Sequence, residues 1–98
     1  MSVDVALCVL ANYFVQMAIF YVVNDSPCAV EVFVSSYTGG DDSWLILDPH
    51  DRQVWNHRKG WETVAFKDPR DSSKRGGIYA PVGSVVVFNG DFKKIEVK

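Results

Sequence analysis

The chain has 98 residues, of which 48% are hydrophobic, and a formal net charge of −2 at pH 7. This length predicts a single domain spanning residues 1–98, and the apolar content argues against a disordered chain. Because acidic and basic residues are interspersed, the charge gives no general attraction to nucleic acid or to anionic membranes. The only basic cluster, which two aspartates dilute, comprises Lys67, Arg70, Lys74 and Arg75.

Residues 3–23 form a long apolar stretch at the start of the sequence. A signal peptide begins with basic residues, but Asp4 precedes this stretch and no Lys or Arg occurs before Arg52. A membrane span runs through about 20 apolar residues, and Asn12 and Gln16 interrupt this one. We therefore predict that the stretch belongs to the fold and that the protein is cytoplasmic, which leaves unconventional export open.

Two periodicities compete within this stretch. All odd positions from 3 to 23 are apolar, which is the period-2 pattern of a β-strand. The β-branched and aromatic residues favour a strand for residues 13–23, whereas strand and helix both remain open for residues 3–10. A helix would align a polar stripe of residues spaced four apart, namely Asp4, Cys8, Asn12 and Gln16.

The two cysteines, Cys8 and Cys28, form neither a CxxC motif nor a Cys/His metal site. We interpret them as buried free thiols in a reducing compartment, as is usual for cytosolic proteins. A single disulfide stays open if the strands that carry them lie side by side.

Further strands follow the turn at residues 24–27, where Asn, Asp, Ser and Pro are adjacent. The valines at positions 30, 32 and 34 alternate with other residues, and we expect them to face the core. Residues 44–47 are apolar on both faces, which predicts a strand that is central or lies in a sandwich core, and Pro49 ends it. The strands predicted after this turn cover residues 52–55, 61–66, 78–80, 83–88 and 92–98.

The segment WNHRKGWETVAF, residues 55–66, carries two of the three tryptophans. It predicts a strand–turn–strand unit in which Val54 and Trp55 end one strand. Residues 56–60 then turn, and residues 61–66 run back through the core. We expect the other strands to pack on this pair.

The most polar segment, residues 67–77, is predicted to be a long exposed loop. The pair Asn89-Gly90 favours a type I′ hairpin turn before the last strand. In that strand Ile95 and Val97 are expected to face inward, while charged residues guard a sheet edge. About seven to eight short strands separated by regular turns predict an all-β fold, a small antiparallel β-sandwich.

Several features of residues 22–68 occur together in one family. They are an asparagine turn, the alternating strand VEVFV, the proline-ended strand WLILDP, and a basic-glycine-aromatic turn that enters a core strand. This order resembles the β-domain of the von Hippel–Lindau type, and it implies a β-sandwich. In that family a His-Ser-Trp-Tyr group captures hydroxyproline. Trp61 follows Gly60 where the family has histidine, so the resemblance does not imply the peptide-binding function.

The sequence contains no arrangement typical of an enzyme. No nucleophile lies in a recognisable elbow, and no phosphate-binding loop is present. The histidines lack partners for a metal, and the aspartates lack the spacing of a calcium loop. The aspartates considered for a calcium loop are Asp41, Asp42, Asp48 and Asp51. We therefore predict no catalytic residue, no metal and no cofactor.

The three tryptophans are either core anchors or a platform for a ligand. Trp44 shares its strand parity with Ile46 and is expected in the core. Trp55 lies on a polar side of its strand, and Trp61 begins a strand beside a glycine turn. Core and surface both stay open for these two tryptophans.

These features favour a non-enzymatic binding module that meets a glycan or a protein segment through loops, in the manner of a lectin. A second hypothesis is a homodimer, because the apolar residues 3–23 exceed what one face of a small sandwich needs. A third is a β-sandwich that binds a membrane surface, which requires exposed aromatic residues at one end. The predicted ligand-binding residues are Tyr37, Asp42, His50, Trp55, His57 and Trp61.

Overall fold

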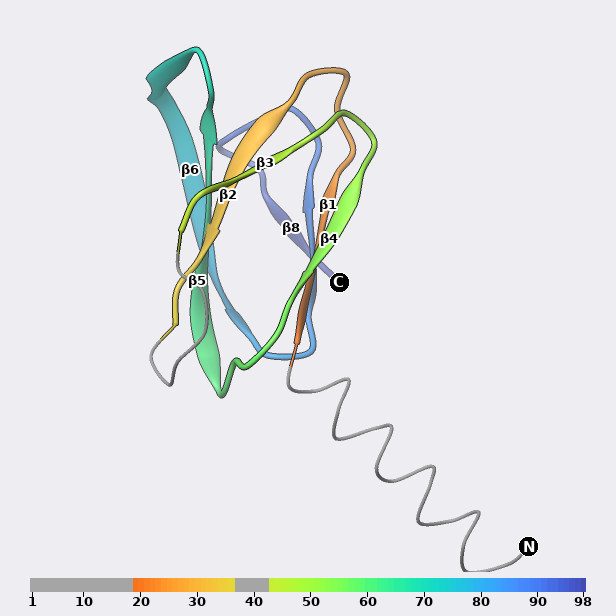
Figure 1. Cartoon of the computed structure of the whole chain (residues 1–98), viewed down its shortest axis with the longest axis vertical. Helices are drawn as coiled ribbons and strands as arrows, with labels where there is room; N and C mark the ends of the chain where they lie inside the picture. The colour runs from red at the N-terminus through yellow and green to blue at the C-terminus, as the bar shows by residue number, and fades with distance from the viewer. Residues whose placement is uncertain (1–18, 37–42) are drawn as a thin grey trace, which may run out of the picture.

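The computed structural model describes residues 19–36 and 43–98, which form eight strands and no helix (Figure 1). Sheet A has the strand order β4-β1-β7-β8, and sheet B has the order β3-β2-β5-β6. The predicted all-β sandwich is thus confirmed, and no helix of the described residues is long and apolar enough to cross a membrane. The strands are β1 (Phe20–Asn24), β2 (Val30–Val34), β3 (Leu45–Leu47), β4 (Arg52–Trp55), β5 (Trp61–Asp68), β6 (Asp71–Pro81), β7 (Val85–Phe88) and β8 (Glu96–Val97).

Neighbouring strands pair antiparallel except in the middle of sheet A. There β1 and β7 run parallel, with Tyr21 beside Val85 and Asn24 beside Phe88. Parallel strands need a long connection between them. Here the connection from β1 to β7 contains β4 and all four strands of sheet B. Sheet A is consequently assembled from segments near both ends of the described sequence.

Alternating residues of the two sheets form the core between them. The valines at positions 30, 32 and 34 are at most 1% exposed, which confirms their predicted direction. Phe66 of sheet B stacks on Phe88 of sheet A, with ring centroids 5.3 Å apart. Burying one such side chain stabilises the fold by about 1.5–3 kcal/mol, so these contacts hold the two layers together.

The strand–turn–strand unit at residues 54–66 has the predicted boundaries, but its two strands do not pair. Strand β4 ends at Trp55 and pairs with β1 in sheet A. Strand β5 begins at Trp61 and pairs with β2 and β6 in sheet B. Residues 56–60 therefore cross from one sheet to the other, and Gly60 completes the crossing with a φ of 64° that glycine adopts without strain.

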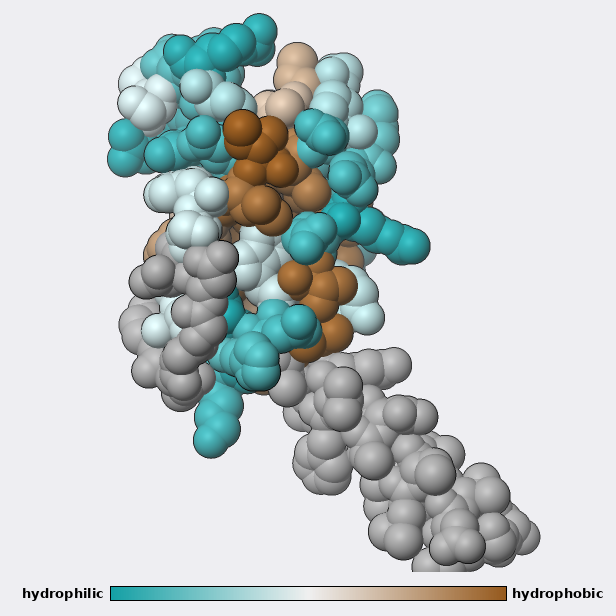
Figure 2. Space-filling model, viewed as in Figure 1, coloured by the Kyte–Doolittle hydropathy of each residue, from teal (hydrophilic) through white to brown (hydrophobic). Residues whose placement is uncertain are grey.

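The prediction of a long loop at residues 67–77 is wrong, because these residues belong to a β-hairpin. Strand β5 runs to Asp68, and β6 already starts at Asp71. Lys67 still pairs with Arg75, and the hairpin continues past the last residue that pairs with β2. Its tip has solvent on both faces and needs no apolar alternation. Figure 2 shows this tip as a hydrophilic region at the upper left.

Residues 89–95 do not form the predicted type I′ turn. That turn requires a positive φ at both central residues, and Gly90 has one of 102° whereas Asn89 does not. The longer segment brings the backbone carbonyl of Phe92 against Gly76 of β6, where any Cβ would overlap it. Gly76 therefore allows this segment to close one side of the sandwich.

Strand β8 lies at the edge of sheet A, as predicted, with Glu96 and Lys98 exposed. Ile95 packs against the core. Val97 was expected to face inward, but it is 39% exposed, because β8 has two residues and no neighbour beyond it.

The predictions for residues 3–18 and for Cys8 lie outside the described residues. Within the described part, the strand expected up to residue 23 is confirmed by β1. Cys28 has a free thiol, as predicted, but it is exposed rather than buried. It lies in the turn after β1, where the chain leaves the core.

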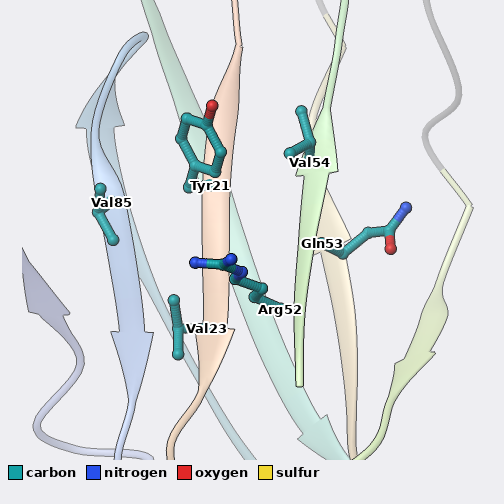
Figure 3. A pocket seen from close by; sticks show the side chains of 6 residues that line it. All are labelled: Tyr21, Val23, Arg52, Gln53, Val54 and Val85. Carbon is teal, nitrogen blue, oxygen red and sulfur yellow. The ribbon is translucent and has the colours of Figure 1, made fainter. Parts of the chain in front are cut away.

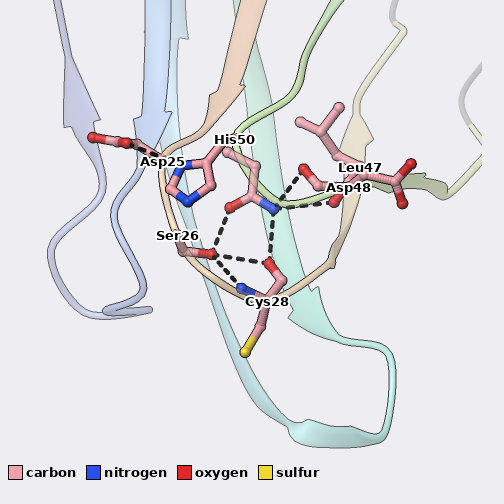
Figure 4. Close-up of polar contacts among 7 residues, drawn as sticks. Asp25, Ser26, Cys28, Leu47, Asp48 and His50 are labelled. Carbon is pink, nitrogen blue, oxygen red and sulfur yellow. Dashed lines mark hydrogen bonds and ion pairs between the residues drawn. The ribbon is translucent and has the colours of Figure 1, made fainter.

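Asn24, at the end of β1, ties two turns together. Figure 4 labels Ser26 and Cys28 of one turn and Asp48 of the other. The buried side-chain Nδ2 of Asn24 donates to the carbonyls of Cys28, Leu47 and Asp48 at 2.9, 3.0 and 3.1 Å. An amide nitrogen has two hydrogens, so at least one of them is shared between two carbonyls. The hydroxyl of Ser26 donates to Asn24 Oδ1 at 2.6 Å. The predicted turn after β1 is thereby joined to the turn between β3 and β4.

Candidate functional site

The three tryptophans lie in different environments. Trp55 is 7% exposed and belongs to the core, which removes it from the predicted ligand-binding surface. Trp44 was expected in the core but is 41% exposed, because β3 is an edge strand and not a central one. Trp61 is 51% exposed at the start of β5. Both exposed tryptophans lie along sheet B.

The outer face of sheet B is made by residues that alternate with its buried ones. On β5 these residues include Thr63 and Ala65. Tyr79 of β6 lies beside Thr63, and Gly77 lies beside Ala65. Phe33 of β2 lies on the other side of Ala65. Strand pairing thus brings residues from three strands to one surface.

Two aromatic pairs stand on this face. Trp61 and Tyr79 stack with ring centroids 5.4 Å apart and an interplanar angle of 29°. Phe33 and Trp44 also have centroids 5.4 Å apart, at an angle of 37°. Such ring contacts contribute about 0.5–1.5 kcal/mol beyond burial, so each pair keeps its rings in place. We call the surface formed by Phe33, Trp44, Trp61, Ala65, Gly77 and Tyr79 the aromatic platform.

Ala65 and Gly77 form the floor of the aromatic platform. Since neither has more than a methyl group, the backbone of two adjacent strands is open between the aromatic pairs. A Cβ at Gly77 would lie 3.6 Å from the Cβ of Ala65, so any longer side chain would rise from the floor. Strand spacing and rise place the Cα atoms of Phe33 and Tyr79 about 12 Å apart.

One ion pair borders the aromatic platform beside Trp44. Lys67 Nζ lies 3.3 Å from Glu31 Oε2 and 4.1 Å from the centroid of the Trp44 ring. The carboxylate and the aromatic face both attract the ammonium group, which holds the lysine side chain along the sheet. The pair offers hydrogen-bond donors and acceptors at the edge of an apolar surface.

The structure does not gather the predicted ligand-binding residues into one site. Tyr37 and Asp42 lie outside the described residues. His50 is exposed in the turn before β4, with Nδ1 3.7 Å from Asp25 Oδ1, whereas exposed His57 follows β4 at its other end. Both histidines have a φ of 59°, a left-handed conformation in which His is enriched. Their backbone role in turns therefore accounts for both positions.

Phe33 and Tyr79 are the aromatic residues of the platform that the sequence analysis did not consider. Each stands at an outward position of an alternating strand, and its neighbours along the chain point inward. An aromatic residue at an outward strand position was the sequence feature that could have indicated them. It predicted no site by itself, because the sequence did not show that β2, β5 and β6 are neighbours in one sheet.

A carboxylate is buried behind the aromatic platform. Glu62 is fully buried, and its Oε1 accepts a hydrogen bond of 2.9 Å from the hydroxyl of Ser35. Its Oε2 has no hydrogen-bond partner. Because Glu62 alternates with Trp61 and Thr63, it points to the inner side of sheet B and does not reach a ligand on the outer face.

Several hollows lie elsewhere on the described surface. One of them, of about 700 Å³, is on the outer face of sheet A (Figure 3). Another, of about 300 Å³, lies between the edge strands β3 and β4, where Figure 2 shows hydrophobic side chains over β3. One of about 290 Å³ lies beside the hairpin and includes Cys28. Within the described ranges, no group of His, Cys, Asp and Glu residues is arranged to hold a metal ion.

In comparisons with known proteins, no family model, no curated protein and no solved structure matches the chain. The resemblance to the von Hippel–Lindau type therefore stays a prediction. The aromatic platform is the candidate site on the strength of its geometry.

Proposed function

We propose that the protein is a non-enzymatic glycan-binding module that holds a neutral oligosaccharide on the aromatic platform. The observation that carries this proposal is the placement of two aromatic pairs on either side of Ala65, with the rings of Trp44, Trp61 and Tyr79 exposed. Tyr79 is 59% exposed and Trp61 51% exposed, so the part of each ring that is not stacked on the other is open to a ligand. The site differs from the predicted loops, and Trp61 is common to both.

A pyranose ring has two kinds of surface that match the platform. The C–H bonds on the face of the ring are apolar and weakly positive, and they pack on the negative faces of aromatic rings. The hydroxyls around the rim need hydrogen-bond partners. The hydroxyl of Thr63 and the ion pair of Glu31 and Lys67 lie beside the rings and supply them. An extended oligosaccharide that crosses the strands would contact both aromatic pairs.

Charge favours a neutral ligand over a single-stranded nucleic acid. Proteins that bind such strands combine stacking side chains with a strongly positive groove. The net charge of this chain is −2, and Lys67 on the platform is already paired with Glu31 at 3.3 Å. Aromatic stacking without a positive field suits an uncharged sugar.

Calorimetric titration with short gluco-, manno-, xylo- and chito-oligosaccharides tests the proposal. We expect one of these classes to bind and to change the tryptophan emission, because Trp61 is exposed at the site. The substitutions Trp61→Ala and Tyr79→Ala should each weaken that binding at least about tenfold, since each removes one ring and releases its stacked partner.

Tyr21→Ala is the matched control, because Tyr21 is a 36% exposed tyrosine on the outer face of the other sheet. This variant should bind the oligosaccharide with unchanged affinity per chain. The proposal is wrong if none of the four classes binds, or if Tyr21→Ala and Tyr79→Ala weaken binding equally. A peptide that binds through Trp61 and Tyr79 in place of any sugar would assign the platform to a protein ligand.

A further inference from the structure

The part of the outer face of sheet A that β4, β1 and β7 form is largely apolar, although the solvated face of a sandwich sheet normally carries polar residues. Tyr21 and Val23 of β1 and Val85 of β7 point away from the core and stand in front of their strands in Figure 3. Val54 of β4 lies beside Tyr21 and is 37% exposed. Together they line the hollow of about 700 Å³. Adjoining apolar residues on an outer face offer a surface that another element can cover.

Arg52 is the charged residue that lines this hollow. Its guanidinium reaches across β1 in Figure 3. It forms no ion pair with any residue of the described ranges. Glu96 of β8 and Lys98 after it lie beside Val87 and Val85 at the edge of this face, where they pair with each other at 3.8 Å. The part of the face that β4, β1 and β7 form therefore combines an apolar surface with the one positive charge of Arg52.

The sequence before β1 has the complementary composition. Residues 3–17 are mostly apolar, and Asp4 is the only charged side chain before Asp25. An apolar segment with one negative charge matches the surface of β4, β1 and β7, which is largely apolar and carries one positive charge. Burying both apolar surfaces against each other contributes about 25 cal/mol for each Å² removed from water.

The point where this segment joins the sheet favours a second copy of the chain as its acceptor. The segment leads directly into β1, the strand that carries Tyr21 and Val23. To cover its own sheet it must reverse direction, and the nearest preceding residue that favours a turn is Asn12. A hairpin centred on Asn12 places residues 1–3 opposite residues 21–23. Most of the segment then remains away from the face.

We propose that the outer face of sheet A binds residues 3–17 of a second copy, so that the chain forms a two-fold symmetric dimer. In such a dimer each copy gives its segment and receives its partner's. Asp4 of each copy then meets Arg52 of the other. The aromatic platforms, on the opposite outer face, remain open in both copies.

Charge reversal in the full-length chain tests both the interface and its exchange between copies. Asp4→Lys places two positive charges together in its homodimer, and Arg52→Glu places two negative charges together. We expect each variant alone to raise the dimer dissociation constant at least about tenfold, because like charges facing each other are costly. Sedimentation equilibrium measures this constant.

An equimolar mixture of the two variants is the decisive sample. In the mixed dimer the two substituted side chains, one positive and one negative, face each other, and Asp4 faces Arg52 at the second contact. Dimerisation should therefore return to the wild-type level. A segment that folds onto its own chain gives no such recovery. Lys59→Glu, a charge reversal between β4 and β5 away from the hollow, is the matched control and should dimerise like the wild type.

Three results would overturn the proposal. The first is a wild-type chain that is monomeric at a concentration of about 100 μM, where even weak dimers assemble. The second is a mixture that stays as dissociated as its two components. The third is a Lys59→Glu control whose dimer dissociation constant is raised as much as that of Arg52→Glu. Near-ultraviolet circular dichroism of each variant confirms that its core is intact. Recovery in the mixture itself shows that both variants fold.

Discussion

The outer faces of the two sheets differ although the sheets share one core and have four strands each. Sheet B carries aromatic rings on either side of Ala65 and Gly77, whereas sheet A carries aliphatic side chains around Tyr21. Aromatic rings over a flat floor can stay in water and still hold a ligand by its face. Contiguous valines gain free energy only when water is removed from them. The comparison suggests an exchangeable ligand for one face and a lasting contact for the other.

Dimerisation through sheet A would raise the affinity of the aromatic platforms for a polymeric ligand. A dimer formed through sheet A presents two platforms on its outer surfaces. Binding of the second platform to the same polysaccharide is then intramolecular, and the overall affinity exceeds that of one platform. Short oligosaccharides report the affinity of a single platform and separate the two effects.

The largest expected effect comes from removing the Asn24 side chain, whose hydrogen bonds link the turn after β1 to the turn between β3 and β4. Asn24→Ala deletes the amide that donates to the carbonyls of Cys28, Leu47 and Asp48. These buried groups lose their partner, so we expect the free energy of unfolding to fall by about 2–4 kcal/mol. Urea denaturation followed by tryptophan emission measures the loss.

Asn56→Ala provides the comparison, because Asn56 is exposed in the connection between β4 and β5. It should change the free energy of unfolding by less than about 0.5 kcal/mol. Equal stability of the two variants would mean that the Asn24 network contributes little and that the sheets are held by the hydrophobic core alone.

A smaller and more selective effect is expected from filling the floor of the platform. Ala65→Arg places a long side chain between the two aromatic pairs, where it excludes a sugar ring. We expect oligosaccharide affinity to fall at least about tenfold, with dimer mass and unfolding free energy unchanged. Ser72→Arg adds the same charge on the exposed hairpin and should leave the affinity intact. Unaltered affinity in Ala65→Arg would place the ligand elsewhere.

The smallest effect concerns the hairpin tip, which belongs to neither face. Ser73 donates to Asp71 Oδ1 from its hydroxyl at 2.6 Å and from its backbone nitrogen at 3.1 Å. These bonds hold the pKa of Asp71 below its ordinary value of 3.8. Because the folded state has the lower pKa, the ionised carboxylate stabilises the hairpin above pH 3.8, and this contribution is lost as the pH falls through the folded pKa.

Ser73→Ala should therefore raise the pKa of Asp71 toward 3.8, and carbon-detected NMR titration measures it. Ser72→Ala, one residue earlier, should leave the pKa of Asp71 where it is. Oligosaccharide affinity and dimer mass should not respond to either change. A response of the affinity to Ser73→Ala would show that the hairpin tip takes part in the platform.

The strands with one buried face were predictable from the sequence. Strand β2 and the inner part of β5 alternate because the core lies on one side of each and solvent on the other. The apolar residues of β3 predicted a buried strand, but Leu45 and Ile46 are 42% and 58% exposed at a sheet edge. The polar residues 71–75 predicted a loop, but they are paired in a strand that has no core to face.

The candidate site was only partly accessible to sequence reasoning. Trp61 was among the predicted ligand-binding residues, although core and surface both stayed open for it, and its glycine turn was the signal. Its neighbours on the platform were not, because Phe33 and Tyr79 are far from it in sequence and reach it through strand pairing. Pairing depends on long-range contacts that local patterns do not encode. The parallel pairing of β1 with β7 could not be predicted from turn residues either, because no tight turn connects these two strands.

That parallel pair also sets an order for folding during synthesis. Sheet B is built from residues 30–81, so all of its strands are made before β7 is complete. Until then β1 has β4 on one side and an open edge on the other, which is an aggregation hazard. We expect the joining of β1 to β7 to be the slow step, since distant contacts form late. A chain that stops after Pro81 would contain every strand of sheet B and would leave β1 without β7.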